Sequence, residues 1–280
     1  MSELKNVTKI IQPTEVSDGA GVKLKRIIGS QQLDHLDPFL LFDDFGSDNS
    51  DDYIAGFPSH PHRGIETVTY MLEGSFRHED SVGNKGTMES GSVQWMTAGK
   101  GIIHSEMPLM KEGKLRGFQL WINLPASQKM KIPEYQNIEP KYIPKIKSQK
   151  GFQVSLIAGL FEGKFGPIKD GFVDPVYLDV KFETLTTFEH FANILHNAFI
   201  YVVEGSVTIA DNDQVIKKYE MAILGKGERI KVISVEEKSR ILFISGKPIN
   251  EPIARLGPFV MNTKEEIIQA VKDFNENKLC

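Results

Sequence analysis

The segment Tyr70-Met-Leu-Glu-Gly-Ser-Phe76 closely matches a later segment of the same chain, Tyr201-Val-Val-Glu-Gly-Ser-Val207. A second match follows in the same order, between Ala98-Gly-Lys-Gly101 and Leu224-Gly-Lys-Gly227. The first pair is displaced by 131 residues (from 70 to 201) and the second by 126 (from 98 to 224). Two matches in one order at nearly one spacing indicate a duplicated domain with a small change of length.

The residues around both repeats are typical of β-strands. Residues 66–72 alternate, with Val68, Tyr70 and Leu72 on one face. Further β-rich runs are separated by Gly, Asn, Asp and Pro, and they cover residues 115–124, 152–160, 176–182, 198–209 and 240–246. Many short strands between turns are typical of sandwiches and barrels. We therefore expect an all-β fold of two antiparallel barrels or jelly rolls.

One helix is expected, at the C-terminus. Thr263 and Glu266 fit a capping box, and Ile267, Val271 and Phe274 follow at helical spacing. The stretch 131–150 is rich in Pro and Lys and shows little periodicity, which favours a linker. The expected domains are therefore an N-terminal barrel (1–130), a linker (131–150) and a C-terminal barrel that ends in the helix (151–280).

Composition excludes several classes of function. The formal net charge is -4 without a basic run, so we expect no direct contact with nucleic acid. The single cysteine, Cys280, rules out an intrachain disulfide and fits a reducing compartment. The first residues lack the apolar region of a secretory signal, and no stretch approaches the ~18 apolar residues of a membrane span. We expect a cytoplasmic monomer that contacts no membrane, or a nuclear protein if the source is eukaryotic.

Two short motifs in the N-terminal half predict a metal site. His60-Pro-His62 comes just before an expected strand, and His104-Ser-Glu106 follows about forty residues later. Residues i and i+2 of a strand point to the same face, so each pair can direct two ligands into one barrel. Three imidazoles and a carboxylate suit a divalent first-row metal such as Fe, Mn, Ni, Cu or Zn. Four protein ligands also leave open positions on a six-coordinate ion, as catalysis requires.

Chance is the competing explanation, because any two of seven histidines can fall at i and i+2. The duplication provides an internal control. Shifting His60 and His62 by 131 residues gives Phe191 and Asn193. Shifting His104 and Glu106 by 126 residues gives Ile230 and Val232. The second copy thus keeps the turn glycines but loses every ligand, which predicts one metal site, in the N-terminal barrel. We interpret His190 and His196 of the second copy as structural or exposed.

Other polar and aromatic residues near these motifs have simpler explanations. Glu66 follows His62 by four residues, and we expect it behind the ligands or on the surface. A hairpin end explains His78-Glu-Asp80 as well as a functional cluster does. Trp95 and Trp121 fit strand positions and are expected in the core.

Five segments together resemble the pirin family. They are Asp37-Pro-Phe-Leu-Leu-Phe-Asp43, Phe57-Pro-Ser-His-Pro-His-Arg-Gly-Ile-Glu66, Gln94-Trp-Met-Thr-Ala-Gly-Lys-Gly-Ile-Ile-His104, Ser105-Glu-Met-Pro108 and Gly257-Pro-Phe-Val-Met-Asn262. Pirins are bicupins with a metal in the first barrel. The resemblance implies that His60, His62, His104 and Glu106 are the metal ligands. It also implies that Asp43, Phe45 and Phe57 line the substrate pocket, and that Ser105 replaces a small apolar residue.

The resemblance implies two functions. Several pirins, especially bacterial ones, resemble quercetin 2,3-dioxygenases, which open a flavonol with O2 and release carbon monoxide. Animal pirins look instead like iron-dependent nuclear coregulators that bind protein partners. We favour the dioxygenase, with Fe(II), a flavonol-like substrate and Glu106 as the proton acceptor, because a site with open positions suits reaction. The alternatives are a metal-dependent coregulator without turnover, and a scaffold with an inert zinc ion.

Overall fold

The computed structural model describes residues 3–110, 112–168, 171–210 and 213–280. The chain divides into two compact units, each built from two separate stretches. Thr14–Pro140 and Ile249–Cys280 form one unit, which we call the first barrel. Met1–Pro13 and Lys141–Pro248 form the other, the second barrel.

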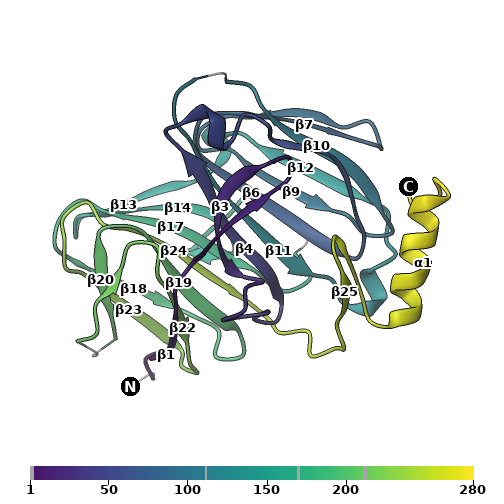
Figure 1. The fold of residues 1–280 in the computed structure, drawn as a ribbon. Coiled ribbons are helices and arrows are strands. Elements are labelled where there is room, and N and C mark those ends of the chain that lie inside the picture. Colours follow the sequence, from purple (N-terminus) through teal and green to yellow (C-terminus); the bar gives the residue numbers. More distant parts are fainter. Residues whose placement is uncertain (1–2, 111, 169–170, 211–212) are drawn as a thin grey trace. The chain divides into compact units, whose positions relative to one another are not determined.

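The first barrel contains a seven-stranded and a four-stranded antiparallel sheet (Figure 1). The larger sheet has the order β12 (Glu134–Ile138), β9 (Val93–Thr97), β6 (Ile65–Glu73), β11 (Leu115–Asn123), β4 (Phe39–Ser47), β3 (Val22–Ile28) and β2 (Thr14–Asp18). The smaller has the order β5 (Phe57–His62), β10 (Ile102–Pro108), β7 (Phe76–Asp80) and β8 (Lys85–Met88). Apolar residues from both sheets, such as Phe45, Met71 and Phe76, form a shared core.

The second barrel repeats this plan. Its larger sheet has the order β1 (Val7–Ile11), β22 (Met221–Leu224), β19 (Asn197–Glu204), β24 (Arg240–Gly246), β17 (Val176–Phe182), β14 (Phe152–Ala158) and β13 (Lys145–Ser148). Its smaller sheet has the order β18 (Thr187–Phe191), β23 (Arg229–Ser234), β20 (Ser206–Ile209) and β21 (Ile216–Lys217). A short hairpin joins β15 (Leu160–Phe161) to β16 (Lys164–Phe165). The predicted all-β fold of two barrels is confirmed.

The domain boundaries differ from those expected at 130 and 150. Strand β1 pairs with β22, so the first residues of the chain belong to the second barrel. The expected linker is not a simple connection, because β12 pairs with β9 and β13 pairs with β14. Each large sheet therefore takes its outer strand from a distant or connecting segment. Three single-turn helices complete the connections: η1 (Ser50–Asp52), η2 (Ala126–Gln128) and η3 (Pro140–Tyr142).

The C-terminal helix α1 (Lys264–Asn275) has the predicted capping box of Thr263 and Glu266. It belongs to the first barrel and not, as expected, to the second. It packs beside the hairpin of β25 (Ala254–Leu256) and β26 (Phe259–Met261) (Figure 1). Arg63 Nη1 also donates to Asp273 Oδ2 at 2.7 Å, which joins the helix to the residue after His62. The helix thus stabilises the segment that carries two predicted ligands.

Candidate metal centre

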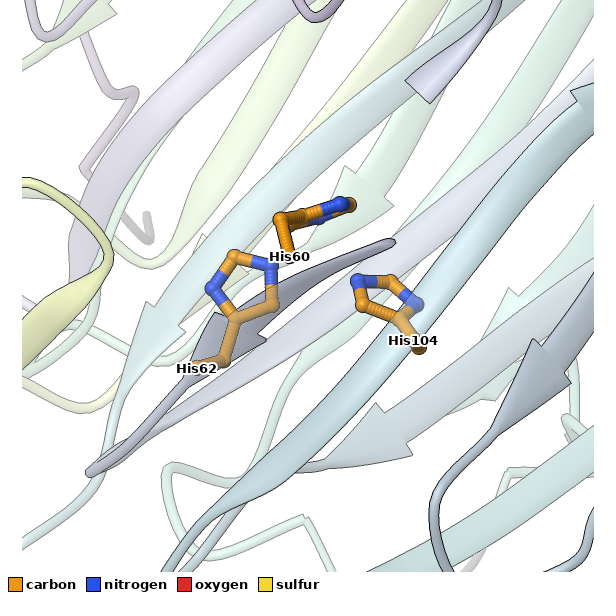
Figure 2. A group of neighbouring side chains, drawn as sticks. All are labelled: His60, His62 and His104. Carbon is orange, nitrogen blue, oxygen red and sulfur yellow. The ribbon is translucent and has the colours of Figure 1, made fainter. Parts of the chain in front are cut away.

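Two strands of the small sheet carry the three predicted histidine ligands. His60 and His62 lie on β5, and His104 lies on β10 opposite His60. Alternation along β5 places His60 and His62 on one face. One nitrogen of each ring lies within 4.8 Å of the other two, and Figure 2 shows the three rings gathered around one space. The structure therefore brings three of the four predicted ligands together.

The hydrogen bonds of the three rings leave one nitrogen of each free to bind a metal. His60 Nδ1 donates to the Pro58 carbonyl at 2.8 Å, and the Pro258 carbonyl accepts from His62. His62 Nδ1 and His104 Nε2 are buried and have no hydrogen-bond partner among the described residues. Buried nitrogens without partners are costly, and a divalent ion would satisfy both. The residues present therefore fit the metal that the sequence predicts.

Burial also sets the protonation of these imidazoles. Removal from water lowers the pKa of His62 well below its ordinary 6.5, and the nearby His60 lowers it further. Burial likewise lowers the pKa of His104, with a smaller contribution from His62. Both rings are therefore neutral near pH 7. A neutral imidazole keeps the lone pair that a metal requires.

Glu106, the fourth predicted ligand, lies outside this set of close nitrogens. Its buried carboxylate accepts a hydrogen bond from Thr69 Oγ1 at 3.0 Å and another from Gln119 Nε2 at 2.9 Å. Gln119 is held in turn, since its Oε1 accepts from Trp121 Nε1 at 3.1 Å. The carboxylate is thus fixed by neutral donors, two residues along β10 from His104. Its role as a ligand stays a prediction.

A cavity of about 520 Å³ opens beside the histidines. His60 and His62 form part of its wall, and so do all three predicted pocket residues, Asp43, Phe45 and Phe57. The rings of Phe45 and Phe57 meet edge to face, with centroids 6.4 Å apart. This volume is within the range of small-molecule sites, which are about 300–1,000 Å³.

Asp43 does not face the cavity as an isolated carboxylate. Arg26 binds it through two hydrogen bonds, from Nε to Oδ1 at 2.9 Å and from Nη2 to Oδ2 at 2.7 Å. Burial raises the pKa of Asp43 to about 6 even though Arg26 opposes the shift. The paired guanidinium and carboxylate form a polar section of the same wall that carries Phe45 and Phe57.

The structure adds cavity residues that the sequence analysis did not name. They include Arg26, Gln119 and Arg255, whose guanidinium lies 5.1 Å from the ring centroid of Trp121. Trp121 was expected in the core, and it both packs there and lines the cavity. Alternation along β11 puts Gln119 and Trp121 on one face, so the strand pattern contained this signal.

Glu66 is buried, so it is not on the surface, one of the two places expected for it. Side chains along β6 point alternately to its two faces, so Glu66 points away from the face that carries Thr67 and Thr69. Thr69 is the residue that contacts Glu106. Glu66 therefore lies on the opposite face of the strand from the site. Its Oε1 accepts from Thr97 Oγ1 at 2.7 Å. Burial raises the pKa of Glu66 to about 7, although hydrogen bonds from Thr97 and Trp95 oppose the shift.

Glu66→Gln is expected to stabilise the protein at alkaline pH. Because the folded-state pKa lies above the ordinary 4.5, the folded chain holds this proton more tightly than the unfolded chain. The resulting stability is complete below pH 4.5 and is lost as the pH rises through 7. The rise of the pKa from 4.5 to about 7 corresponds to about 3 kcal/mol of unfolding free energy, which the amide would restore. Urea unfolding of both proteins at pH 5 and pH 8.5 measures this, and an equal difference at the two values would contradict it.

The second barrel has an apolar interior where the first has its ligands. Ile230 and Val232 are fully buried in its core. Strand pairing places His190 opposite Ile230, as His60 lies opposite His104, so the shift of 131 is one residue too long at this strand. The His190 ring packs near Phe161, Phe188 and Phe243, and burial lowers its pKa to about 4.

His190 is thus structural, in agreement with the sequence analysis. His196 is also largely buried, and its Nε2 lies 3.4 Å from Asp174 Oδ2. Within the described ranges, His60, His62 and His104 are the only set of three His, Cys, Asp or Glu side chains found close enough to share a metal. This agrees with a single site in the first barrel.

Comparison with known proteins identifies the family. The pirin family model matches residues 21–122, and the model of the pirin C-terminal cupin domain matches residues 177–280. A pirin-like protein from Caulobacter vibrioides is 45% identical over 276 residues, covering 98% of this chain and 99% of the relative. The chain belongs to the pirin family.

Two further comparisons place this pirin among its relatives. It is 42% identical to human pirin over 282 residues, which cover 99% of this chain and 95% of the human protein. A solved structure of a quercetin 2,3-dioxygenase from Acinetobacter baumannii shares 35% identity with a TM-score of 0.90. That match covers 99% of this pirin and 98% of the solved chain. The cupin-type fold implied by the resemblance to the pirins is confirmed.

The described part of the chain contains one α-helix and three single-turn helices. None of them combines the length and the apolar character that crossing a bilayer requires.

Proposed function

We propose that this pirin is a metal-dependent dioxygenase that opens a flavonol such as quercetin with O2. The observation that carries the proposal is the set of three close imidazoles, of which His60 and His62 line a cavity of about 520 Å³. Among the described residues, the buried His62 Nδ1 and His104 Nε2 have no hydrogen-bond partner. The Acinetobacter baumannii relative, a quercetin 2,3-dioxygenase by name, supports the same reaction class.

His60, His62 and His104 would hold the metal, with Glu106 as a fourth ligand or a close neighbour. Nitrogen ligands with a carboxylate suit Fe(II), which we propose as the metal, and Mn, Ni and Cu are also compatible with this set. When bound, such a metal supplies a Lewis acid for the substrate's oxygen and one-electron chemistry with O2.

Glu106 is the residue placed to accept the proton of the flavonol 3-hydroxyl. Its carboxylate is held in position by hydrogen bonds from Thr69 and Gln119. A proton acceptor must lie within hydrogen-bond reach of the group it deprotonates, and Glu106 shares β10 with the ligand His104. Gln119, which donates to Glu106, lines the cavity, and this contact supports the proposed role.

The cavity walls suit a flat aromatic substrate. Phe45, Phe57 and Trp121 offer apolar ring surfaces, and they exclude water from the bound substrate. Arg26 and Arg255 provide donors for the hydroxyl and carbonyl oxygens that a flavonol carries at its edges. The overall reaction consumes one O2 and releases one CO for each flavonol opened.

The test is an assay of protein purified without oxygen and loaded with Fe(II). With quercetin, we expect O2 uptake and CO release in a ratio of about one to one, both abolished when a chelator removes the metal. If one metal binds per chain and neither gas changes, the dioxygenase proposal is wrong. The metal-dependent coregulator would then be the better account.

A further inference from the structure

His78 lies directly behind His104 and has no part in the proposed reaction. It is fully buried on β7, the strand that pairs with β10. Its Nδ1 lies 3.4 Å from His104 Nδ1, on the side of His104 away from the nitrogen that lacks a partner. Its Nε2 lies 3.1 Å from Asp80 Oδ2. Asp80, His78 and His104 thus form a chain that leads toward the metal centre.

Asp80 fixes the direction of this chain at its outer end. Its Oδ1 accepts from the backbone N–H groups of Val82 (3.1 Å) and Asn84 (2.9 Å), and its Oδ2 accepts from Asn84 Nδ2 (2.9 Å). Burial acts to raise the pKa of Asp80, but hydrogen bonds from Asn84 and His78 outweigh it and hold the pKa below its ordinary value. The ionised carboxylate can only accept, so His78 Nε2 is the donor.

The remaining contacts define the other nitrogen of His78. Gln94 Nε2 donates to His78 Nδ1 at 3.2 Å, so this nitrogen is an acceptor. The Tyr135 ring stacks on the imidazole, with centroids 4.6 Å apart, and prevents it from turning over. Because His78 Nδ1 carries no proton, its 3.4 Å contact with His104 Nδ1 is a hydrogen bond when His104 carries the proton, and the lone pair of His78 Nδ1 is then shared between Gln94 and His104. His104 Nε2 then has a free lone pair at the metal centre.

We propose that His78 and Asp80 are positioning residues that hold His104 in the tautomer required to bind the metal. The inference rests on the proposed metal centre, and it assigns a role to two residues outside the ligand set. Partners that orient a ligating histidine contribute about 10- to 100-fold to metal affinity in proteins.

The second barrel supports this role. Strand pairing places Ile209 opposite Val232, as His78 lies opposite Glu106. Ile209 is therefore the counterpart of His78, and it is buried in the apolar core. The second barrel, which lacks the four predicted metal ligands, thus also lacks a histidine at the position of His78. If His78 only filled space beneath the sheet, an apolar side chain such as that of Ile209 would serve equally well.

Asp80→Asn tests the tautomer directly. The two backbone N–H groups require an oxygen, so the new amide would turn its NH2 group toward His78 Nε2. His78 would then carry its proton on Nδ1, and Gln94 would turn its Oε1, which has no partner among the described residues, toward that nitrogen in place of its NH2 group. The His78 proton would then face His104 Nδ1 as an acceptor, which would place the His104 proton on Nε2. Long-range 1H–15N spectra of the metal-free protein should show His104 protonated on Nδ1 in the wild type and on Nε2 in the variant.

Metal affinity is the second readout. With Co(II) in competition with a chelator, we expect Asp80→Asn to bind 10- to 100-fold more weakly than the wild type. Glu79→Gln is the matched control, because Glu79 lies between His78 and Asp80 with a side chain 41% exposed, and it should bind as the wild type does. Thermal unfolding without metal verifies that both variants fold.

The outcomes separate this inference from the metal centre itself. If His104→Ala loses Co(II) but Asp80→Asn binds within twofold of the wild type, the positioning role is wrong and the metal centre stands. If His104→Ala also binds normally, the metal centre is wrong. If Asp80→Asn does not fold, the wild-type spectrum decides, since a His104 protonated on Nε2 would overturn the proposal.

Discussion

Glu106→Gln is expected to lower the turnover of quercetin per bound metal by about 100- to 10,000-fold, the usual contribution of a positioned proton acceptor. The amide has nearly the same shape as the carboxylate but cannot take the 3-hydroxyl proton. Its oxygen can still accept from Gln119 Nε2, and its NH2 group can donate to the Thr69 hydroxyl, so both contacts of Glu106 have an equivalent. The variant should therefore fold.

Turnover must be divided by bound metal, because Glu106 can also contribute to metal affinity. Glu66→Gln is the matched control: it makes the same change at a buried carboxylate on the opposite face of β6 from Thr69. The control should retain wild-type turnover. If Glu106→Gln kept the wild-type turnover per bound metal, a group other than Glu106 would accept the 3-hydroxyl proton.

His62→Ala is expected to weaken metal binding by about 100- to 1,000-fold and to abolish turnover with it. Structural metal sites bind with roughly 10–16 kcal/mol, so one of four ligands accounts for about 2.5–4 kcal/mol. In the metal-free state the same substitution removes a buried nitrogen without a partner, so it should cost less there than an ordinary cavity. The variant therefore separates loss of metal from loss of fold.

Thermal unfolding with and without Fe(II) measures this difference. A ligand at 1,000 times its dissociation constant stabilises a protein by about 4 kcal/mol, and His62→Ala should lose most of that increment. His35→Ala is the control, because His35 is partly exposed, pairs with Asp34 and is not among the residues that line the cavity. An equal metal-dependent increment in wild type and His62→Ala would remove His62 from the ligand set.

The duplication and the strand patterns were readable from the sequence because both depend on local order along the chain. Turn glycines recur at a fixed spacing, and alternation assigns faces without knowledge of contacts. The one-residue error at His190 shows the limit of this approach. The ladder of the first barrel is irregular between His104 and Glu106, while Ile230 and Val232 follow a regular ladder, so a fixed shift fails across that strand.

Long-range pairing explains the boundaries that the sequence did not reveal. β1 completes a sheet whose other strands begin more than one hundred residues later, and no local signal marks that partner. The C-terminal helix likewise showed its apolar face and its cap, but its position against the first barrel depends on Arg63 and Asp273, which are far apart in sequence.

The same limit applies to the site. His60, His62 and His104 could be predicted because spacing within each strand reports a shared face. The contacts that hold Glu106, from Thr69 and Gln119, come from two other strands and follow only from the sheet register. The pair of Arg26 with Asp43 is equally invisible in the sequence, since neither residue forms a recognisable motif with the other.

Anomalous diffraction from crystals loaded with Fe(II) tests the central claim most directly. The account predicts one anomalous peak per chain, within bonding distance of nitrogens from His60, His62 and His104. The absence of a peak at that position, or a peak bound only by other residues, would contradict it.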